Sequence, residues 1–121
     1  MTDYIFDVDG TLMNVEARAE YAKKEKRDTD RVMNWDLFLN EGVMYSFDKP
    51  NWDVCDIFSA LRNKAGNNMI ITTARNERHR EVTEEQLKDA GVWGFVKIYM
   101  RKDGDMRPDD RVNKIINIIS I

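Results

Sequence analysis

Tyr4-Ile5-Phe6-Asp7-Val8-Asp9-Gly10-Thr11 is an apolar, β-rich run that ends in an acidic turn. Its aromatic and branched residues favour a strand over residues 4–8, which Asp9-Gly10 then ends. Alternate side chains of a strand share a face, so Asp7 and Asp9 converge at the tip if the strand continues to Asp9. The simpler interpretation is a turn that only terminates the strand. A carboxylate inside an apolar run is costly, which favours a functional role for Asp7.

Two close carboxylates also indicate a particular ligand. They repel each other and attract a divalent cation, and hard oxygen ligands suit Mg²⁺, which in turn neutralises substrate phosphates. We therefore expect Asp7 and Asp9 to bind Mg²⁺. Gly10 permits a sharp turn and a close approach of the backbone to a ligand.

Strands and helices alternate along the rest of the chain. The expected helices cover residues 15–27, 31–40, 54–61, 78–90 and 108–119, and the expected strands cover residues 69–72 and 95–100. Gly42 is expected to stop the second helix, and residues 47–50 are expected to form a connector. Helices between consecutive strands imply parallel pairing, so the sequence predicts an α/β fold with a parallel sheet flanked by helices.

Length and composition limit the classes of protein that fit. The chain has 121 residues, of which 42% are hydrophobic and 34% charged, so we expect a single globular domain over residues 1–121. The net charge of −3 argues against a general coat for DNA or RNA. Cys55 is the single cysteine, which excludes an internal disulfide and a four-cysteine zinc site. No apolar run approaches the roughly 18 residues of a membrane span. Because the first expected strand begins almost at once, we expect no signal peptide and a location in the cytoplasm.

Open parallel sheets bind ligands beyond the carboxyl ends of their strands, so candidate groups are sought after each strand. The second strand end carries Thr72-Thr73-Ala74-Arg75. The Arg75 guanidinium suits bidentate binding of a phosphate. We interpret Thr72 as an ordinary strand residue, and residues 78–80, which include His79, as a solvated helix start.

The motif Phe6-Asp7-Val8-Asp9-Gly10-Thr11-Leu12 resembles the first motif of the haloacid dehalogenase (HAD) superfamily of phosphatases. The resemblance implies a Rossmann-like HAD fold in which Asp7 is the nucleophile that becomes an aspartyl-phosphate and Asp9 is the general acid and base. It also implies that Thr73 hydrogen-bonds the transferring phosphoryl group. The other expected phosphate-binding positions near these two motifs are Gly10, Thr11, Ala74 and Arg75. An ionised carboxylate can attack phosphorus in line when a metal screens its charge, which agrees with these roles.

The third strand end resembles a narrower group of proteins. Residues 101–110 follow the pattern Arg-x-x-Gly-Asp-x-Arg-x-Asp-Asp, which is similar to the 3′-phosphatase domain of phage polynucleotide kinase and related phage HAD proteins. Arg101 and Arg107 are the expected phosphate ligands of this loop. The structural alternative is a charged loop that Asp109 caps at a helix start.

Residues 14–51 take the place of the usual short loop after the first motif. We expect them to form a small helical cap insert over the site. The residues that resemble the insert of the phage proteins are Trp35, Asp36 and Phe38, followed by Asp48-Lys49-Pro50. The resemblance therefore runs from Ile5 to about Ile119.

Two features depart from the superfamily pattern. The lysine expected in the last helix falls at Asn113, with Lys114 next, and one residue is a rotation of about 100° on a helix. We assign the catalytic lysine to Lys114, which needs an adjusted register to reach the site. The sequence also ends before the last acidic motif of the superfamily, so we expect a fold truncated at the C-terminus, weak binding of Mg²⁺, and self-association through an open sheet edge.

Together these features predict a Mg²⁺-dependent phosphomonoester hydrolase that forms an aspartyl-phosphate. The first expected substrate is a 3′-phosphate end of nucleic acid, and the residues that could form a basic mouth for it are Arg75, Arg78, Arg80, Arg101, Lys102, Arg107 and Lys114. A mononucleotide phosphatase is the close alternative. A non-catalytic, phosphate-binding fragment completed by a partner is an alternative of a different class, and a sugar-phosphate mutase needs the same nucleophile.

Overall fold

The computed structural model describes residues 2–103 of the 121-residue chain. The expected helix over residues 108–119 lies outside the described residues, and so do the candidate residues Arg107, Asn113 and Lys114. What the sequence indicates for them stays a prediction.

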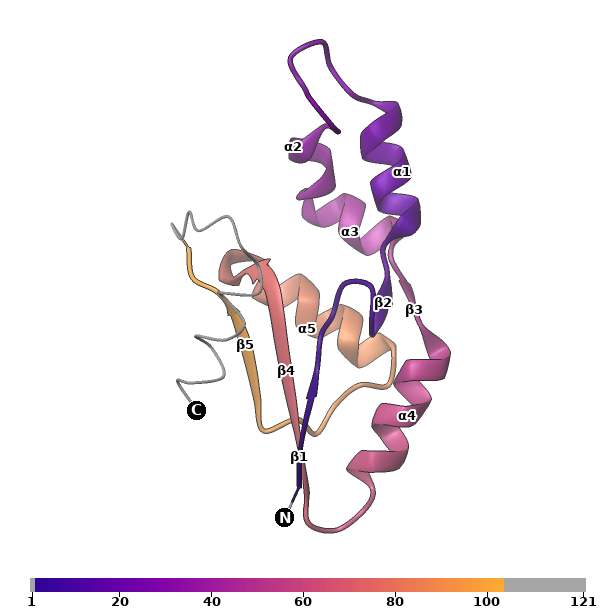
Figure 1. Ribbon diagram of the computed structural model, residues 1–121, viewed down its shortest axis with the longest axis vertical. Helices are drawn as coiled ribbons and strands as arrows, with labels where there is room; N and C mark the ends of the chain where they lie inside the picture. The colour runs from indigo at the N-terminus through magenta and orange to yellow at the C-terminus, as the bar shows by residue number, and fades with distance from the viewer. Residues whose placement is uncertain (1, 104–121) are drawn as a thin grey trace.

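Three parallel strands form the main sheet of the described chain (Figure 1). β1 (Thr2–Phe6), β4 (Asn67–Asn76) and β5 (Lys97–Arg101) lie in the order β1-β4-β5. Phe6 pairs with Ile71 across β1 and β4, and β4 and β5 also run parallel, with an irregularity near the end of β4. The predicted α/β fold with a parallel sheet is confirmed, and β1 lies at one edge of the described sheet.

Two helices join the strands and cover the core. α4 (Trp52–Arg62) precedes β4, and α5 (Arg80–Asp89) follows β4 through the short 3-10 helix η1 (Glu77–His79). Phe58 and Leu87 are fully buried, and burial of such side chains stabilises a fold by about 1.5–3 kcal/mol each. The other buried residues of the same cluster are Val8, Leu12, Met13, Cys55, Met69, Ile71, Ala90, Val92, Ile98 and Met100. No helix within residues 2–103 is long and apolar enough to cross a bilayer.

Between β1 and α4 the chain leaves the sheet and forms three further helices. A short antiparallel ribbon of β2 (Met13–Asn14) and β3 (Lys49–Pro50) connects them to the core. The helices α1 (Glu16–Lys24), α2 (Trp35–Phe38) and α3 (Glu41–Phe47) gather beyond the carboxyl ends of the strands (Figure 1). We call α1, α2, α3 and their connections the helical insert.

Some predicted boundaries in this region are wrong. The sequence predicts one helix over residues 31–40 with Gly42 as its stop, but α2 has only four residues and Gly42 lies within α3. Asparagine caps explain the difference, because the side chains of Asn34 and Asn40 accept backbone N–H groups at 3.3 and 3.1 Å and start a new helix each. Residues 47–50, a predicted connector, contain β3.

The first strand also ends earlier than predicted, at Phe6. The loop that follows folds back on itself: Gly10 adopts a φ of +82°, which favours glycine, and its N–H donates to the Met13 carbonyl at 2.8 Å. Asp7 and Asp9 therefore lie in a loop rather than on one face of a strand. The strand-based reason for their convergence does not apply.

Candidate active site

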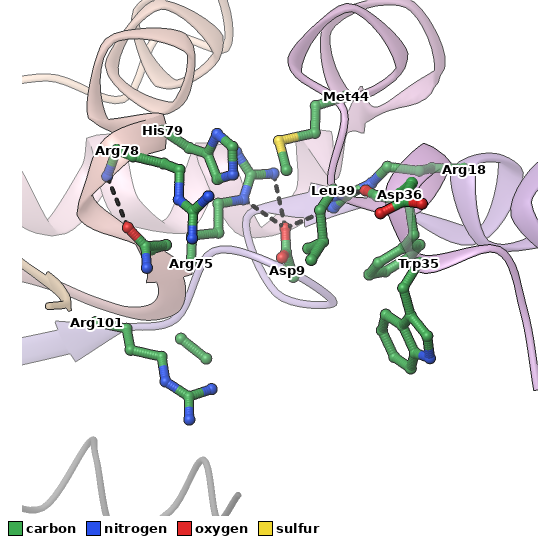
Figure 2. A pocket seen from close by; sticks show the side chains of 13 residues that line it. Asp9, Arg18, Trp35, Asp36, Leu39, Met44, Arg75, Arg78, His79 and Arg101 are labelled. Carbon is green, nitrogen blue, oxygen red and sulfur yellow. Dashed lines mark hydrogen bonds and ion pairs between the residues drawn. The ribbon is translucent and has the colours of Figure 1, made fainter. Parts of the chain in front are cut away.

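A cavity of about 620 Å³ lies where the helical insert meets the carboxyl ends of the strands (Figure 2). This is the position at which open parallel sheets bind ligands. Its described lining consists of Asp9, Arg18, Trp35, Asp36, Phe38, Leu39, Met44, Ala74, Arg75, Asn76, Arg78, His79 and Arg101. Four predicted site residues, Asp9, Ala74, Arg75 and Arg101, are thus brought together in one cavity.

Asp9 is held by two arginines. Its Oδ1 accepts N–H groups from Arg75 Nη2 at 2.7 Å, from Arg75 Nε at 3.0 Å and from Arg18 Nη2 at 3.2 Å. Arg75 reaches it from the end of β4 and Arg18 from α1, so the two guanidinium groups approach from different sides (Figure 2). Because 32% of the Asp9 side chain is exposed, this carboxylate is fixed in position yet accessible from the cavity.

Every N–H group of the Arg75 guanidinium donates a hydrogen bond to a residue that the structure describes. Besides Asp9, its Nη2 donates to Asp48 Oδ2 at 3.0 Å, and its Nη1 donates to Thr83 Oγ1 at 3.0 Å and to Gln86 Oε1 at 2.6 Å. A guanidinium has five N–H donors, and these contacts account for all of them. The predicted role of Arg75 as a phosphate ligand therefore requires it to exchange one of these partners.

Asp48 also joins the two arginines. Its fully buried carboxylate accepts from Arg18 Nε at 3.0 Å through Oδ1 and from Arg75 Nη2 through Oδ2. Burial raises the pKa of the Asp48 carboxyl above its ordinary value, and the two guanidinium groups oppose that rise. Asp9, Arg18, Asp48 and Arg75 form a closed ring of alternating charge.

Arg18 is a member of this ring that sequence reasoning missed. It is 1% exposed, its Nη1 donates to the Phe38 carbonyl at 2.9 Å, and its guanidinium carbon lies 4.4 Å from the centroid of the Phe38 ring. A signal was present in the sequence, since Arg18 shares a helical face with Val15 and Ala22 at positions i, i+3 and i+7. A charge inside an apolar stripe indicates a buried partner.

Two polar residues of α5 were missed in the same way. Thr83 and Gln86 follow the helical spacing i, i+3, i+4 and i+7 with Leu87 and Ala90, so they occupy the buried face of the helix. Both side chains bind Arg75. The sequence signal for this contact was the presence of two polar residues, Thr83 and Gln86, on the apolar face of a predicted helix.

The other predicted residues of the first two motifs are close in sequence to residues that line the cavity, but they are not part of its lining. These are Asp7, Gly10, Thr11 and Thr73. Asp7 Oδ1 accepts the N–H of the next residue at 2.8 Å, and the buried Thr73 Oγ1 accepts the Arg75 N–H at 3.1 Å. The catalytic and phosphate-binding roles of these residues stay predictions.

His79 corrects one expectation. The sequence indicates a solvated helix start over residues 78–80, but His79 is buried and lines the cavity. Its Nδ1 lies 2.9 Å from Glu41 Oε1 of α3, so this side chain faces the helical insert. The burial of His79 depends on contacts with distant residues such as Glu41, and no local sequence pattern contains that information.

The rim of the cavity combines basic and apolar side chains. Arg78, whose side chain is 63% exposed, lies 3.4 Å from Asp103, and Arg101 lies across from it on β5 (Figure 2). From the helical insert, Trp35 and Leu39 are about half exposed. This rim offers positive charge to a phosphate and an apolar surface to the group that carries it.

The parallel α/β sheet with a cavity at the carboxyl ends of its strands is typical of a ligand-binding or catalytic domain. Comparisons with known proteins show the family to which the chain belongs. A family model of the HAD superfamily, subfamily IIIB (acid phosphatase), matches residues 1–115. The chain belongs to this family. The predicted superfamily and the predicted enzyme class, a HAD-type phosphatase of phosphate monoesters, are confirmed.

Two solved structures share the fold at low sequence identity. One is a chain of the Pnkp1/Rnl/Hen1 RNA repair complex, with 22% identity and a TM-score of 0.68, and the other is a chain of a Pnkp1/Rnl/Hen1 complex, with 22% identity and a TM-score of 0.69. Each match covers 99% of this chain but only 32% and 34% of the other chains, so the protein spans about a third of their length. Among curated proteins, none matches the chain.

The superfamily implies a magnesium site, which the residues present can supply. Within residues 2–103 there is no group of three or more His, Cys, Asp or Glu that could hold a metal ion. Mg²⁺ is usually bound by only one or two carboxylates together with water and substrate phosphates. Asp7 and Asp9 offer hard oxygen donors of this kind, and Asp9 is partly exposed at the cavity. Both carboxylates have the donor chemistry that Mg²⁺ requires, and their role as its ligands stays a prediction.

Proposed function

We propose that the chain is a Mg²⁺-dependent phosphomonoesterase that acts through an aspartyl-phosphate on Asp7, with 3′-phosphate ends of nucleic acid as its substrate. One observation carries the proposal. In a chain of the HAD phosphatase family, Asp9 forms part of the wall of a cavity at the carboxyl ends of the strands, two residues after Asp7.

The proposed reaction has two steps. The Asp7 carboxylate attacks the phosphorus, and the bond from phosphorus to the leaving oxygen breaks as Asp9 donates a proton to that oxygen. Asp9 then takes a proton from a water molecule, whose oxygen attacks the same phosphorus. The bond between phosphorus and the Asp7 oxygen breaks, which releases inorganic phosphate and regenerates the Asp7 carboxylate. Bound Mg²⁺ supplies screening of the negative charge on the phosphate. Thr73 hydrogen-bonds the phosphoryl group and Lys114 holds it against the nucleophile.

The choice of a nucleic-acid end rests on three supports. The loop over residues 101–110 resembles that of phage 3′-phosphatases. Arg78 and Arg101 place positive charge at the rim, where a phosphorylated strand would enter. A chain of an RNA repair complex has the same fold. We also propose that β1, an edge strand of the described sheet, pairs with a second copy or with a partner.

The test is phosphate release from a matched panel of substrates, with Mg²⁺ and with excess chelator. The panel contains one oligonucleotide phosphorylated at either the 3′ or the 5′ end, and 3′- and 5′-mononucleotides. We expect turnover only with Mg²⁺ and fastest on the 3′-phosphorylated oligonucleotide. Preference for mononucleotides supports the alternative of a nucleotide phosphatase. No turnover on any substrate, with wild-type folding, supports a phosphate-binding fragment that needs a partner.

Self-association is tested separately by light scattering of the full chain over a range of concentrations. A dimer that dissociates in Ile5→Lys, which places a charge at a side chain of β1 that is 45% exposed, while the monomer still unfolds cooperatively, supports pairing through this edge. A chain that stays monomeric at every concentration contradicts it.

A further inference from the structure

Gln86 of α5 is a buried amide that joins three parts of the site. It is 4% exposed, and its Oε1 accepts from Arg75 Nη1 at 2.6 Å. Its Nε2 donates to the Met44 carbonyl of α3 at 2.8 Å and to Asp48 Oδ2 at 3.3 Å. One side chain therefore contacts the arginine that holds Asp9, the helical insert, and the carboxylate that links the two arginines.

These contacts decide how the Arg75 guanidinium lies. The group is planar, so fixing Nη1 also fixes the directions of Nη2 and Nε. Gln86 and Thr83, one turn apart on α5, bind the two N–H groups of Nη1. Nη2 and Nε are then left to face Asp9, at 2.7 and 3.0 Å.

We propose that Gln86 is a positioning residue, which sets the plane of the Arg75 guanidinium against Asp9 and holds the helical insert in register with it. This inference rests on the proposed function, in which Asp9 exchanges protons with the substrate. Gln86 itself does not line the cavity, so its effect on the reaction passes through Arg75.

A second contact between α3 and α5 provides a matched control. The Tyr45 hydroxyl donates to Asp89 Oδ2 at 3.1 Å, and this hydrogen bond includes neither Arg75 nor Asp9. If Gln86 only docked the helical insert onto α5, loss of the Tyr45 hydroxyl would have a comparable effect on the site. If Gln86 acts through Arg75, loss of the Gln86 contacts disturbs the site, whereas loss of the Tyr45 hydroxyl does not.

The experiment compares Gln86→Met, which removes all three contacts at similar volume, with Thr83→Val and with the control Tyr45→Phe. The first readout needs no activity: hydrogen exchange of the Arg75 Nε–H group in the ¹⁵N-labelled full chain, assigned by its loss in Arg75→Lys. We expect exchange to be faster by about tenfold in Gln86→Met, less so in Thr83→Val, and unchanged in Tyr45→Phe.

The second readout is turnover of p-nitrophenyl phosphate with Mg²⁺. We expect kcat to fall by about tenfold in Gln86→Met with little change in KM, because the lost contact orients a group rather than binds substrate. In the background of Arg75→Lys, Gln86→Met should add little further loss, whereas independent effects would multiply.

Three results would overturn the inference: wild-type exchange of Arg75 in Gln86→Met, an equal change in Tyr45→Phe, or independent losses in the double variant. If Gln86→Met does not unfold cooperatively, Gln86→Asn takes its place, since its amide is too short to reach both Arg75 and Met44, and the same criteria apply. Absence of turnover in the wild-type chain contradicts the proposed function, while the exchange measurement still decides the role of Gln86.

Discussion

Arg75 binds Asp9 through two nitrogens, with Nη2 at 2.7 Å and Nε at 3.0 Å from the same carboxylate oxygen. The two residues are 66 positions apart in the sequence. They meet because Asp9 follows β1 and Arg75 belongs to the end of β4, and these neighbouring strands run parallel. Arg18 adds a second cation from the helical insert, so the core and the insert together fix the predicted acid and base.

We expect Asp7→Asn to abolish turnover and to leave the thermal unfolding temperature close to that of the wild-type chain. The amide keeps the size and the hydrogen-bonding oxygen of Asp7 but lacks the charge of a nucleophile. Phosphate release with Mg²⁺, measured alongside a thermal melt, checks both statements. Wild-type turnover in this variant would exclude Asp7 as the nucleophile.

Arg18→Met should destabilise the fold strongly. Arg18 is 1% exposed and neutralises two carboxylates, and removing one partner of a buried ion pair typically costs about 3–5 kcal/mol. The free energy of unfolding from urea titration measures the loss. Arg27→Met is the matched control, because Arg27 is a half-exposed arginine that also contacts two carboxylates, and we expect it to have little effect. Equal effects of the two substitutions would contradict the importance of the buried ring.

Arg101→Ala should weaken substrate binding. Arg101 lines the cavity at its rim, and loss of a guanidinium contact to phosphate removes a charge-assisted hydrogen bond worth about 1.5–3 kcal/mol. We therefore expect KM for the best substrate of the panel to rise by about tenfold or more. Lys97→Ala removes an exposed positive charge at the first residue of β5, outside the cavity lining, and it should leave KM unchanged. A KM in Arg101→Ala equal to that of the control would exclude phosphate binding by Arg101.

Cys55 should make the fold sensitive to alkaline pH. Its side chain is buried, its Sγ–H donates to the Leu12 carbonyl at 3.4 Å, and burial raises the pKa of the thiol above its ordinary value. The folded state therefore keeps a proton that the unfolded state has lost, so this contribution to stability is complete below about pH 8.5 and declines as pH rises further.

The measurement is the free energy of unfolding from pH 7 to 10 for the wild-type chain and for Cys55→Ala. The substitution leaves a cavity and costs stability at neutral pH, and we expect the gap between the two proteins to narrow above pH 8.5. The native thiol should also react slowly with iodoacetamide and rapidly after unfolding. A constant gap, or rapid labelling of the native chain, would contradict a buried thiol.

Local sequence patterns predicted most of the scaffold. Val54, Ile57, Phe58 and Leu61 at helical spacing predict a helix that the structure contains as α4, and the aliphatic run over residues 69–72 lies inside β4. Such patterns suffice because the burial of one helix face or one strand is encoded by neighbours in the chain. These patterns did not predict the ends of the helices in the insert. Asn34 and Asn40 each cap the start of a helix, and a cap depends on a single side chain rather than on the spacing of apolar residues.

The sequence by itself predicted that the strands pair in parallel, identified the family motif at Asp7 and Asp9, and indicated the strand ends at which ligands bind. Only the tertiary structure decided that Asp9 is bound by Arg18 and Arg75, and that Asp48 links both. Buried polar groups must find partners wherever the fold brings them, and contacts such as that between Asp9 and Arg75 span most of the chain. No local periodicity can specify them, because the partners become neighbours only after the sheet and the helical insert have packed together.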